Sequence, residues 1–441
     1  MSPQKSISAD FRYNTGAAKI PWAAVGENVS SKDTIELIKF LCKPKQGQTK
    51  AYNATIKKVS ESIHALYRVG KPAGKLSLGQ EVKKVEQLAC KMLDVKHGVL
   101  LTNATAGFEI GYQYANLGPG DEVIAPAITF IATIAYPLTI GAKVVLADVD
   151  PRTLNMDPRD VERKITPKTK VIIPVHLGGY PVDMDPIMKL ARKHNITVIE
   201  DAAHGFGGRY KNKMLGTIGH FGAFSFHEVK NVTSMGEGGL VVTNLPFGRH
   251  LPQARFLGLD MSRKIENWLY DVIALEGKYG FVAAGNHSAT EIQAVGLYQQ
   301  IKRMGKIIRA RRQAAEYLTG RFKTESGIIP QLLDTPSIQS SHHLYLLQID
   351  PETVGADIQH LKRKLSDRGI VQIPHFGPLY KFSIMKQLGY DTEAIQDGCP
   401  AAEEAFNHRF THLPLYKYTR DDLKYMADAV IESVRELKSG R

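Results

Sequence analysis

The chain has 441 residues, of which 43% are hydrophobic, and this is enough for a large core divided between two subdomains. No apolar run is long enough to span a bilayer and no signal-peptide core opens the chain, so we expect a cytoplasmic protein without a membrane partner. The three cysteines are too dispersed for a disulfide framework or a zinc site, and the net charge of +13 lies in small groups that favour anionic small molecules over nucleic acid.

The first 70 residues contain few strand signals. Ile35, Ile38 and Leu41 recur at helical spacing, which predicts an amphipathic helix. Regular alternation of helices and strands begins only at Gly79. We therefore expect residues 1–70 to form an N-terminal extension.

The first strand of the alternating pattern is predicted over residues 98–102. Asn103 and the small residues Ala104, Thr105 and Ala106 follow it directly and open a helix. Unpaired N–H groups and the helix dipole both favour an anion at such a position. The segment therefore predicts an anion site, although an ordinary helix cap would show the same pattern.

Further strands are predicted over residues 123–127, 144–148 and 171–175. Phe130 follows the first of them, where a single aromatic side chain is more often part of the core than of a binding site. His176 follows the last. Strands that alternate with helices in this way indicate an α/β fold with a mainly parallel sheet.

The most informative stretch covers residues 197–244. Its first apolar run ends at Asp201, with His204 three residues later, and a second run ends at Ser225 and is followed by Lys230. Parallel-sheet proteins bind their ligands beyond the carboxyl ends of the strands. An acid, a hydroxyl and a lysine at such ends form a set that suits pyridoxal phosphate.

The chemistry of pyridoxal phosphate explains why these residue types are needed. The cofactor requires an amine that holds its aldehyde and later moves a proton, and Lys230 is the candidate. Its ring accepts electrons only while the ring nitrogen stays protonated, so a carboxylate, for which Asp201 is the candidate, should lie against that nitrogen. Ser225 and the glycine-rich turn of residues 236–239 can donate to the phosphate. A lone lysine is usually a surface charge, but this one lies between two apolar β runs.

The run SFHEVKN, followed by GEGG and preceded by VIEDAAHGFGG, resembles the DegT/DnrJ/StrS sugar aminotransferases. The resemblance extends from about Gly79 to the C-terminus and implies a fold-type I enzyme that depends on pyridoxal phosphate. We therefore expect the aspartate aminotransferase-like fold. It has a three-layer αβα large domain with a mixed, mainly parallel sheet, and a smaller α+β domain at the C-terminus.

The resemblance also implies roles for four of the positions named above. Phe130 would stack on the pyridine ring, His204 would bond the phenolic oxygen of the cofactor, and His176 would lie close to cofactor and substrate. Residues 104–106 read Ala-Thr-Ala where the family has Gly-Thr-Ala, and this change keeps the backbone donors of a phosphate site.

Three positions in the second half of the chain resemble family positions at the active site: Asn286 on the cofactor side, and Ser288 and His375 on the substrate side. Asn286 matches an asparagine that reaches the cofactor phosphate of a neighbouring subunit, so we expect a homodimer; alternatively, Asn286 is only a turn residue before a helix. Ser288 stands where the family has an arginine, which puts the family's usual substrate geometry in question. His375 lies in a loop that borders the active site in the family.

The last third of the chain reads as a smaller α+β unit. We predict a strand over residues 343–349, a helix over 356–368 and a further strand over 370–373. We therefore divide the chain into three parts. They are the N-terminal extension over residues 1–70, a large cofactor-binding domain over residues 71–300 and a small domain over residues 301–441.

The sequence therefore predicts an aminotransferase that uses pyridoxal phosphate and no metal. By resemblance, it transfers an amino group from glutamate or glutamine to a keto sugar, preferably a nucleotide-linked one, or to a keto cyclitol. Two alternatives remain. A keto-sugar dehydratase of the same family typically has histidine in place of Lys230, and a non-catalytic regulatory protein on the same fold would be expected to lack Lys230 or Asp201.

Overall fold

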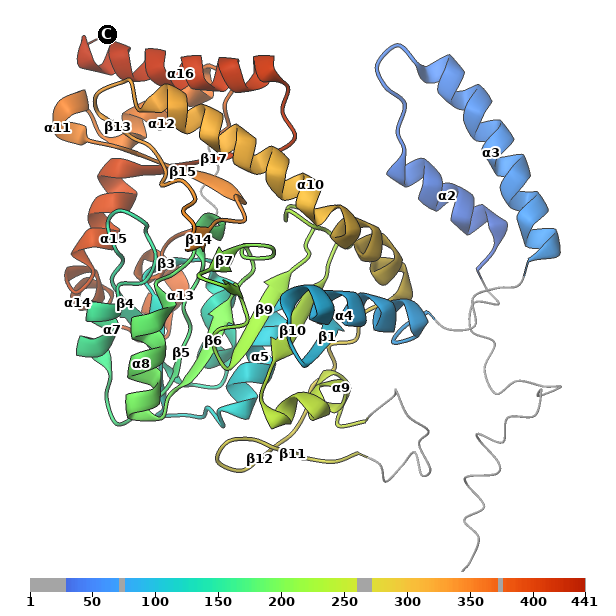
Figure 1. Ribbon diagram of the computed structural model, residues 1–441, viewed down its shortest axis with the longest axis horizontal. Coiled ribbons are helices and arrows are strands. Elements are labelled where there is room, and N and C mark those ends of the chain that lie inside the picture. The colour runs from blue at the N-terminus through green and yellow to red at the C-terminus, as the bar shows by residue number, and fades with distance from the viewer. Residues whose placement is uncertain (1–28, 71–75, 260–271, 372–375, 441) are drawn as a thin grey trace, which may run out of the picture.

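A computed structural model describes residues 29–70, 76–259, 272–371 and 376–440 (Figure 1). A large α/β body lies beneath a smaller unit formed by the C-terminal third, and a hairpin of two helices stands to one side of both (Figure 1). None of the helices in the described ranges combines the length and the hydropathy needed to cross a bilayer.

The body is built on a seven-stranded sheet in which only one strand runs against the others. The antiparallel strand is β10 (Gly239–Thr243), which pairs with both β1 and β9. In spatial order the remaining strands are β1 (His97–Leu101), β9 (Phe221–Ser225), β6 (Thr197–Asp201), β5 (Thr169–Ile172), β2 (Glu122–Pro126) and β4 (Lys143–Ala147). The sheet is thus mixed and mainly parallel, as predicted, and the carboxyl ends of its parallel strands meet at one edge.

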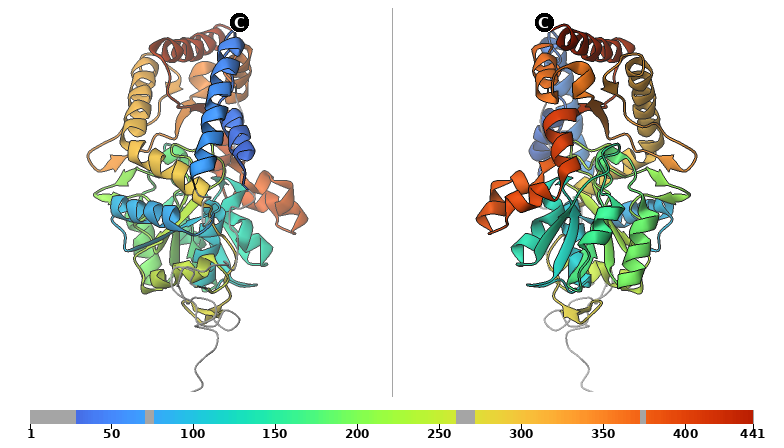
Figure 2. Two further views of the ribbon diagram at one scale, coloured as in Figure 1. Left: turned by 90° about the vertical axis from the view of Figure 1, so that its right-hand side faces the viewer. Right: turned by 90° about the vertical axis from the view of Figure 1, so that its left-hand side faces the viewer.

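Alternation along the strands explains why helices cover both faces of the sheet. Leu101 and Ile199 pack into the core on the face covered by α5 (Ala104–Tyr114). Their neighbours Leu100 and Val198 point to the opposite face, toward α4 (Gln80–Leu93) and α8 (Met184–His194) respectively. Successive side chains of a strand point to opposite faces, so a strand buried on both faces yields three layers. Figure 2 shows this layering from both sides.

A single long helix, α10 (Glu291–Phe322), joins the body to the smaller unit. Ala294 and Leu297 near its start pack with α4, whereas Leu318 and Phe322 near its end lie in the core of the smaller unit. That core is formed with a three-stranded antiparallel sheet and two helices: β13 (Ile328–Ile329), β15 (Leu344–Ile349), β17 (Phe410–Pro414), α12 (Ile358–Asp367) and α16 (Arg420–Lys438).

Two predictions for the smaller unit are confirmed, and a third can be compared only in its first half. Strand β15 and helix α12 match the elements predicted over residues 343–349 and 356–368. Ile370 and Val371 do not form the predicted strand, because the N–H of Ile370 closes the end of α12 on the carbonyl of Leu365, at 2.9 Å, and its side chain packs into the core. The rest of that prediction, residues 372–373, lies outside the described residues.

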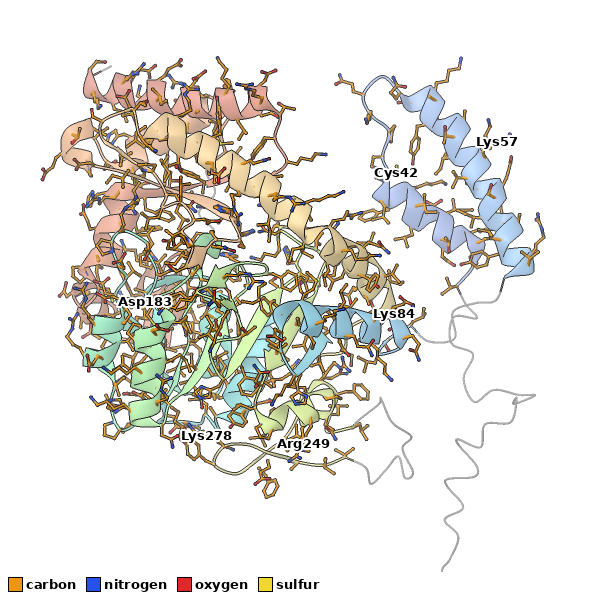
Figure 3. All side chains as sticks on the ribbon, in the orientation of Figure 1. Cys42, Lys57, Lys84, Asp183, Arg249 and Lys278 are labelled. Carbon is orange, nitrogen blue, oxygen red and sulfur yellow. The ribbon has the colours of Figure 1, made fainter. Side chains whose placement is uncertain are left out.

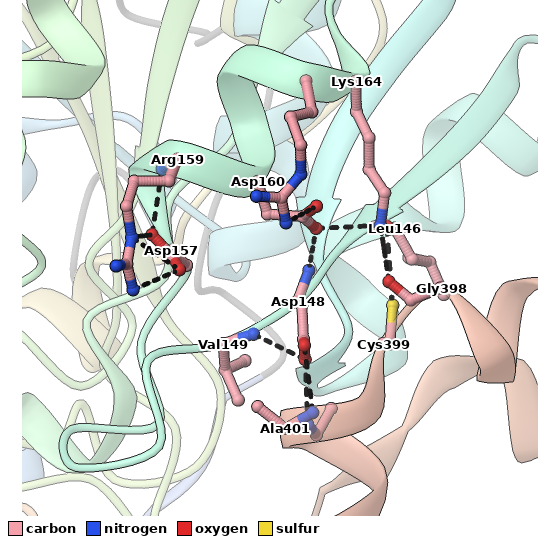
Figure 4. A network of polar contacts seen from close by, with 12 residues as sticks. Leu146, Asp148, Val149, Asp157, Arg159, Asp160, Lys164, Gly398, Cys399 and Ala401 are labelled. Atoms are coloured by element: carbon pink, nitrogen blue, oxygen red, sulfur yellow. Dashed lines mark hydrogen bonds and ion pairs between the residues drawn. The ribbon is translucent and has the colours of Figure 1, made fainter.

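The C-terminal unit also returns to the body, through α15 (Pro400–Glu404), as Figure 4 shows. The Asp148 carboxylate, at the end of β4, accepts hydrogen bonds from the N–H groups of Ala401 and Ala402, at 3.0 and 2.8 Å. Lys164 donates to the carbonyls of Leu146 and Gly398, at 2.8 and 3.0 Å. Both contacts fasten the C-terminal segment to the edge strand of the sheet.

The hairpin consists of α2 (Ser31–Leu41) and α3 (Thr49–Val69). Ser31 Oγ bonds His64 Nδ1 at 2.8 Å and Thr34 Oγ1 bonds Tyr67 Oη at 2.6 Å, so the two helices run side by side. Ile35 and Ile63 are its buried side chains. The extension predicted over residues 1–70 is thus helical in its described part.

The remaining elements are short connections around these layers. The strands are β3 (Ile128–Thr129), β7 (Arg209–Tyr210), β8 (Lys213–Met214), β11 (Leu275–Glu276), β12 (Phe281–Val282), β14 (Ile338–Gln339) and β16 (Gly377–Pro378). The α-helices are α6 (Ala135–Thr139), α7 (Pro158–Lys164), α9 (Leu251–Arg255), α11 (Pro351–Val354), α13 (Ser383–Gln387) and α14 (Thr392–Asp397). The 3₁₀ and π turns are η1 (Ile131–Ile134), η2 (Leu177–Gly179), η3 (Pro246–His250), η4 (Leu379–Lys381) and η5 (Ala405–Arg409).

Candidate active site

Asp201 is a buried carboxylate at the carboxyl end of β6. Its Oδ2 accepts a hydrogen bond from Thr133 Oγ1 at 2.8 Å, and its Oδ1 accepts one from the N–H of Ala203 at 3.1 Å. Burial raises the pKa of Asp201, and these two bonds oppose that rise. Because both donors are neutral, the carboxylate is oriented but not neutralised by them.

Lys230 follows β9, the neighbour of β6 in the sheet, and its side chain is partly buried. Burial lowers the pKa of Lys230 to about 8, although the nearby charge of Asp201 acts in the opposite direction. A substantial fraction of this amine is therefore neutral in mildly alkaline solution. A neutral lysine amine can attack a carbonyl group and can accept a proton.

The start of α5 lies against the first residue of β10, next to Ser225. Asn103 caps the helix by accepting the N–H of Ala106 at 3.0 Å. The first N–H groups of the helix, those of Ala104 and Thr105 among them, have no partners within it, so they can bind an anion. Ser225 pairs with Gly239 across the sheet, which brings its hydroxyl to the same edge.

Gly239 determines how closely α5 approaches the sheet. A Cβ atom at this position would lie 2.2 Å from the carbonyl carbon of Asn103 and 2.7 Å from the nitrogen of Ala104. We expect Gly239→Ala to displace the helix start, weaken cofactor binding, and destabilise the fold by about 1–3 kcal/mol. A cofactor titration and a thermal melt would measure both effects. Gly305→Ala adds the same methyl group inside α10, where no atom lies within 4 Å; it should leave cofactor binding unchanged and should raise the melting temperature slightly.

Phe130 and His204 lie close in sequence to Thr133 and to Asp201, respectively. Phe130 is 57% exposed and directly precedes η1, the turn that carries Thr133. His204 Nδ1 accepts the N–H of Gly178 at 3.3 Å, which leaves the ring proton on Nε2. An exposed aromatic ring and an N–H donor thus lie on the segments that also hold Asp201.

His176, a cofactor-binding candidate of the sequence, is held by the protein itself. Its ring is fully buried; Nδ1 accepts the N–H of Val182 at 3.1 Å and Nε2 lies 3.0 Å from Glu200 Oε2. Both ring nitrogens therefore bind the protein itself. Glu200 in turn accepts the N–H groups of Ile218 and Gly219, each at 2.6 Å, so this pair supports the loop before β9.

Three polar residues of the site were missed by the sequence analysis: Thr133, Asn231 and His343. Asn231 donates from Nδ2 to the carbonyl of Ser341 at 2.8 Å, and its Oδ1 lies 2.9 Å from His343 Nδ1. Burial, together with the charges of His204 and Lys230, holds the pKa of His343 far below its usual value. Asn231 could have been found from the sequence, because it directly follows Lys230. Thr133 and His343 come from distant parts of the chain and gave no such signal.

Asn286 and Ser288 lie together at the end of β1. Ser288 Oγ donates to Asn286 Oδ1 at 2.7 Å, and Ser288 forms a bridge with Leu101. The carbonyl of His287 accepts the N–H of Thr102 at 3.2 Å, which places this segment close to the start of α5. His375, which with Ser288 was predicted to lie on the substrate side, lies outside the described residues.

Known structures show a close likeness to this architecture. The PMP form of the sugar aminotransferase Spr1654 of Streptococcus pneumoniae superposes with a TM-score of 0.74 at 27% identity, over 85% of this chain and 95% of that one. DesI, solved in the presence of its TDP-sugar product, superposes with a TM-score of 0.72 at 25% identity, over 86% and 90% of the two chains. The fold is therefore that of the fold-type I enzymes, and the cofactor is pyridoxal phosphate.

Sequence comparison defines the family within that class. A model of the DegT/DnrJ/EryC1/StrS aminotransferase family matches residues 58–435, so the chain belongs to this family of pyridoxal-phosphate-dependent aminotransferases. The spore coat polysaccharide biosynthesis protein SpsC of Bacillus subtilis is 34% identical over 382 residues, which cover 83% of this chain and 92% of SpsC.

The described residues fit the cofactor. Asp201 is a buried carboxylate held by neutral donors, which suits a protonated ring nitrogen as its cationic partner. Phe130 offers an exposed ring for stacking, and the start of α5 with Ser225 offers donors for a phosphate. The charge of Asp201 acts on the pKa of the Lys230 amine, which fits two groups that serve the same heterocycle.

Proposed function

We propose that the enzyme transfers an amino group from glutamate or glutamine to a keto sugar that carries a nucleotide, or to a keto cyclitol. The observation that carries this proposal is the partly buried Lys230 amine, with a pKa of about 8, close to the buried Asp201. A sugar acceptor is supported by two relatives: DesI has a TDP-sugar product, and SpsC is named for polysaccharide biosynthesis. The presence of both Lys230 and Asp201 disfavours the dehydratase and the non-catalytic alternative.

In this proposal each residue has a separate task. Pyridoxal phosphate supplies an electron sink when it is bound. Asp201, fixed by Thr133, holds the proton on the ring nitrogen, while Phe130 orients the ring by stacking. Lys230 holds the cofactor at rest and moves a proton at its Nζ during transfer. Ser225 and the start of α5, at Ala104 to Ala106, bind the phosphate, and His204 donates to the phenolic oxygen.

The pKa of Lys230 predicts how cofactor loading depends on pH. The amine that attacks the cofactor aldehyde must be neutral, so the rate at which the cofactor-free protein takes up pyridoxal phosphate should rise with pH and level off above a pH of about 8. Stopped-flow measurement of the visible absorbance during loading tests this. A loading rate that falls between pH 7 and pH 9 would exclude the Lys230 amine as the attacking group.

The acceptor can be found by following the cofactor itself. The protein is first converted to its amine-loaded form with glutamate or glutamine, and the donor that achieves this conversion is thereby identified. Nucleotide-linked keto sugars and keto cyclitols are then added separately, and the return of visible absorbance reports transfer. Return with simple keto acids alone would contradict a sugar acceptor.

We also propose that the enzyme is a homodimer in which Asn286 completes the site of the neighbouring subunit. Its side chain is exposed, and Ile292 and Val295 at the start of α10 leave 56% and 52% of their surfaces exposed nearby in sequence. Lys230→Ala and Asn286→Ala should each be inactive or nearly so. A mixed dimer of the two variants contains one intact site, so mixing them should restore activity. If mixing restores none, Asn286 acts within its own chain.

The proposed domain division is 1–70, 71–300 and 301–441. The helix α10 crosses the second boundary without interruption, and its two halves belong to two different cores. The boundary therefore marks a change of core along one helix. Limited proteolysis should therefore not separate the two units by a cut within α10.

A further inference from the structure

The helical hairpin of residues 30–70 is joined to the enzyme but takes little part in its packing. Within the described residues, every side-chain hydrogen bond of the hairpin links two of its own residues. The family model begins only at residue 58, inside α3. The hairpin is thus largely an addition to the aminotransferase, and its function is not explained by the active site.

The free end of the hairpin exposes apolar side chains on one helical stripe. Leu37, Phe40 and Leu41, at positions i, i+3 and i+4 of α2, are 44%, 71% and 51% exposed. Cys42, labelled in Figure 3, immediately follows α2 in the part of the chain that leads to the turn. A stripe of this kind normally packs against a partner, because two helices alone bury too little apolar surface.

The same end carries a strong positive charge. Residues 37–60 contain six lysines and no acidic residue, and the segment 30–70 has eight basic and three acidic side chains, a net charge of +5. Lys43 lies with its Nζ 5.7 Å from the centre of the Phe40 ring, so charge and apolar surface adjoin. Lys57, labelled in Figure 3, points away from the body.

Charge selects among the possible partners. A second copy that met the hairpin end to end would bring Lys43, Lys45 and Lys50 against the same three lysines, so like charges would adjoin. A nucleic acid would satisfy the lysines but not three exposed aliphatic and aromatic side chains beside them. An anionic lipid surface satisfies both, because lysines bind the headgroups while apolar side chains enter the interface.

We propose that the end of the hairpin, residues 37–50, docks on a membrane surface rich in anionic phospholipid and so holds the enzyme at the bilayer. Phe40 and Leu41 enter the interface, and Lys43, Lys45 and Lys50 contact the headgroups. The expectation of no membrane partner was drawn from the lack of a spanning segment, which does not test surface binding.

The first experiment compares the binding of the full-length, cofactor-loaded protein to vesicles. Co-sedimentation is measured with phosphatidylcholine alone and with phosphatidylcholine containing phosphatidylglycerol, at low and high salt. We expect binding to the anionic vesicles only, and weaker binding at high salt. The triple variant Lys43→Gln, Lys45→Gln, Lys50→Gln should bind about 100-fold more weakly at low salt, since each lysine near the surface contributes about fivefold.

A matched control separates the hairpin from net charge. Lys213, Lys306 and Lys386 are exposed lysines of the enzyme body. The variant Lys213→Gln, Lys306→Gln, Lys386→Gln loses the same charge and should bind vesicles like the wild type. Equal loss in both triple variants, or no binding of the wild type to anionic vesicles, would overturn the proposal.

A second variant tests the apolar part. Phe40→Ser with Leu41→Ser should reduce vesicle binding, most clearly at high salt, while transamination and the circular dichroism spectrum stay unchanged. If this variant binds vesicles like the wild type and the protein binds single-stranded RNA through the same lysines, the partner is a nucleic acid and the proposal fails. The proposal also fails if the protein does not bind vesicles and light scattering shows an assembly of chains that the Phe40→Ser, Leu41→Ser variant does not form.

Discussion

Replacing Lys230 with alanine is expected to reduce transamination by at least about 10⁴-fold, because one amine both holds the cofactor and moves the proton. The variant should still bind pyridoxal phosphate through Asp201, Ser225 and the start of α5. It should lack the visible absorbance of the lysine-bound cofactor, which spectroscopy of the purified protein measures together with kcat.

Two control variants make that result specific. Lys213→Ala removes an exposed lysine elsewhere in the body and should leave both activity and absorbance unchanged. Lys230→Arg keeps the positive charge but not the nucleophilic amine, so it should be as inactive as Lys230→Ala. Transamination close to the wild-type rate in either Lys230 variant would show that another amine holds the cofactor.

Asp201→Asn is expected to lower kcat by about 10²–10³-fold, since it removes the charge that keeps the ring nitrogen protonated. Thr133→Val removes only one hydrogen bond to that carboxylate and should cost about tenfold. Kinetics of the donor half-reaction measure both effects. A larger loss in Thr133→Val than in Asp201→Asn would contradict the assignment of the charge to Asp201.

The Asp201→Asn substitution should stabilise the cofactor-free protein. Burial raises the pKa of the Asp201 carboxyl in the folded protein above its value in the unfolded chain. The stability that the protonated carboxyl contributes is therefore fully present below the unfolded pKa and is lost as the pH rises through the folded pKa. At pH values above the unfolded pKa the buried carboxyl therefore weakens the cofactor-free fold, and Asp201→Asn should melt at a higher temperature there. A lower melting temperature would indicate that Asp201 is needed for folding.

The sequence was sufficient to predict the elements that position the site. Asp201 and Ser225 end neighbouring parallel strands, and the helix after β1 starts at the same edge, so one rule about strand ends brought them together. Phe130 follows in the same way from the end of β2. These are local signals, and the chain encodes them within a few residues.

Contacts between distant segments could not be predicted in this way. Thr133 and Asp201 are 68 residues apart, and Asn231 and His343 are 112 apart, with no pattern that links either pair. The same holds for His176: a strand end made it a candidate, but its partners Glu200 and Val182 became visible only in three dimensions.

The extension shows a further limit of periodicity. The spacing of Ile35, Ile38 and Leu41 predicted a helix correctly, and α2 is there. The same spacing predicted a single buried face, yet Ile35 is buried whereas Leu41 is 51% exposed. Hydrophobic spacing identifies a helix but not what covers it.

The uninterrupted course of α10 has a mechanical consequence. Its 32 residues form a stiff rod about 48 Å long. One end is anchored where Glu291 accepts the N–H groups of Gly79 and Glu81, at 2.7 and 2.9 Å, and the other is embedded among Leu318 and Phe322. Swinging the C-terminal unit as a rigid lid would require this rod to bend, so substrate access is expected to rely on local rearrangement of loops at the rim instead.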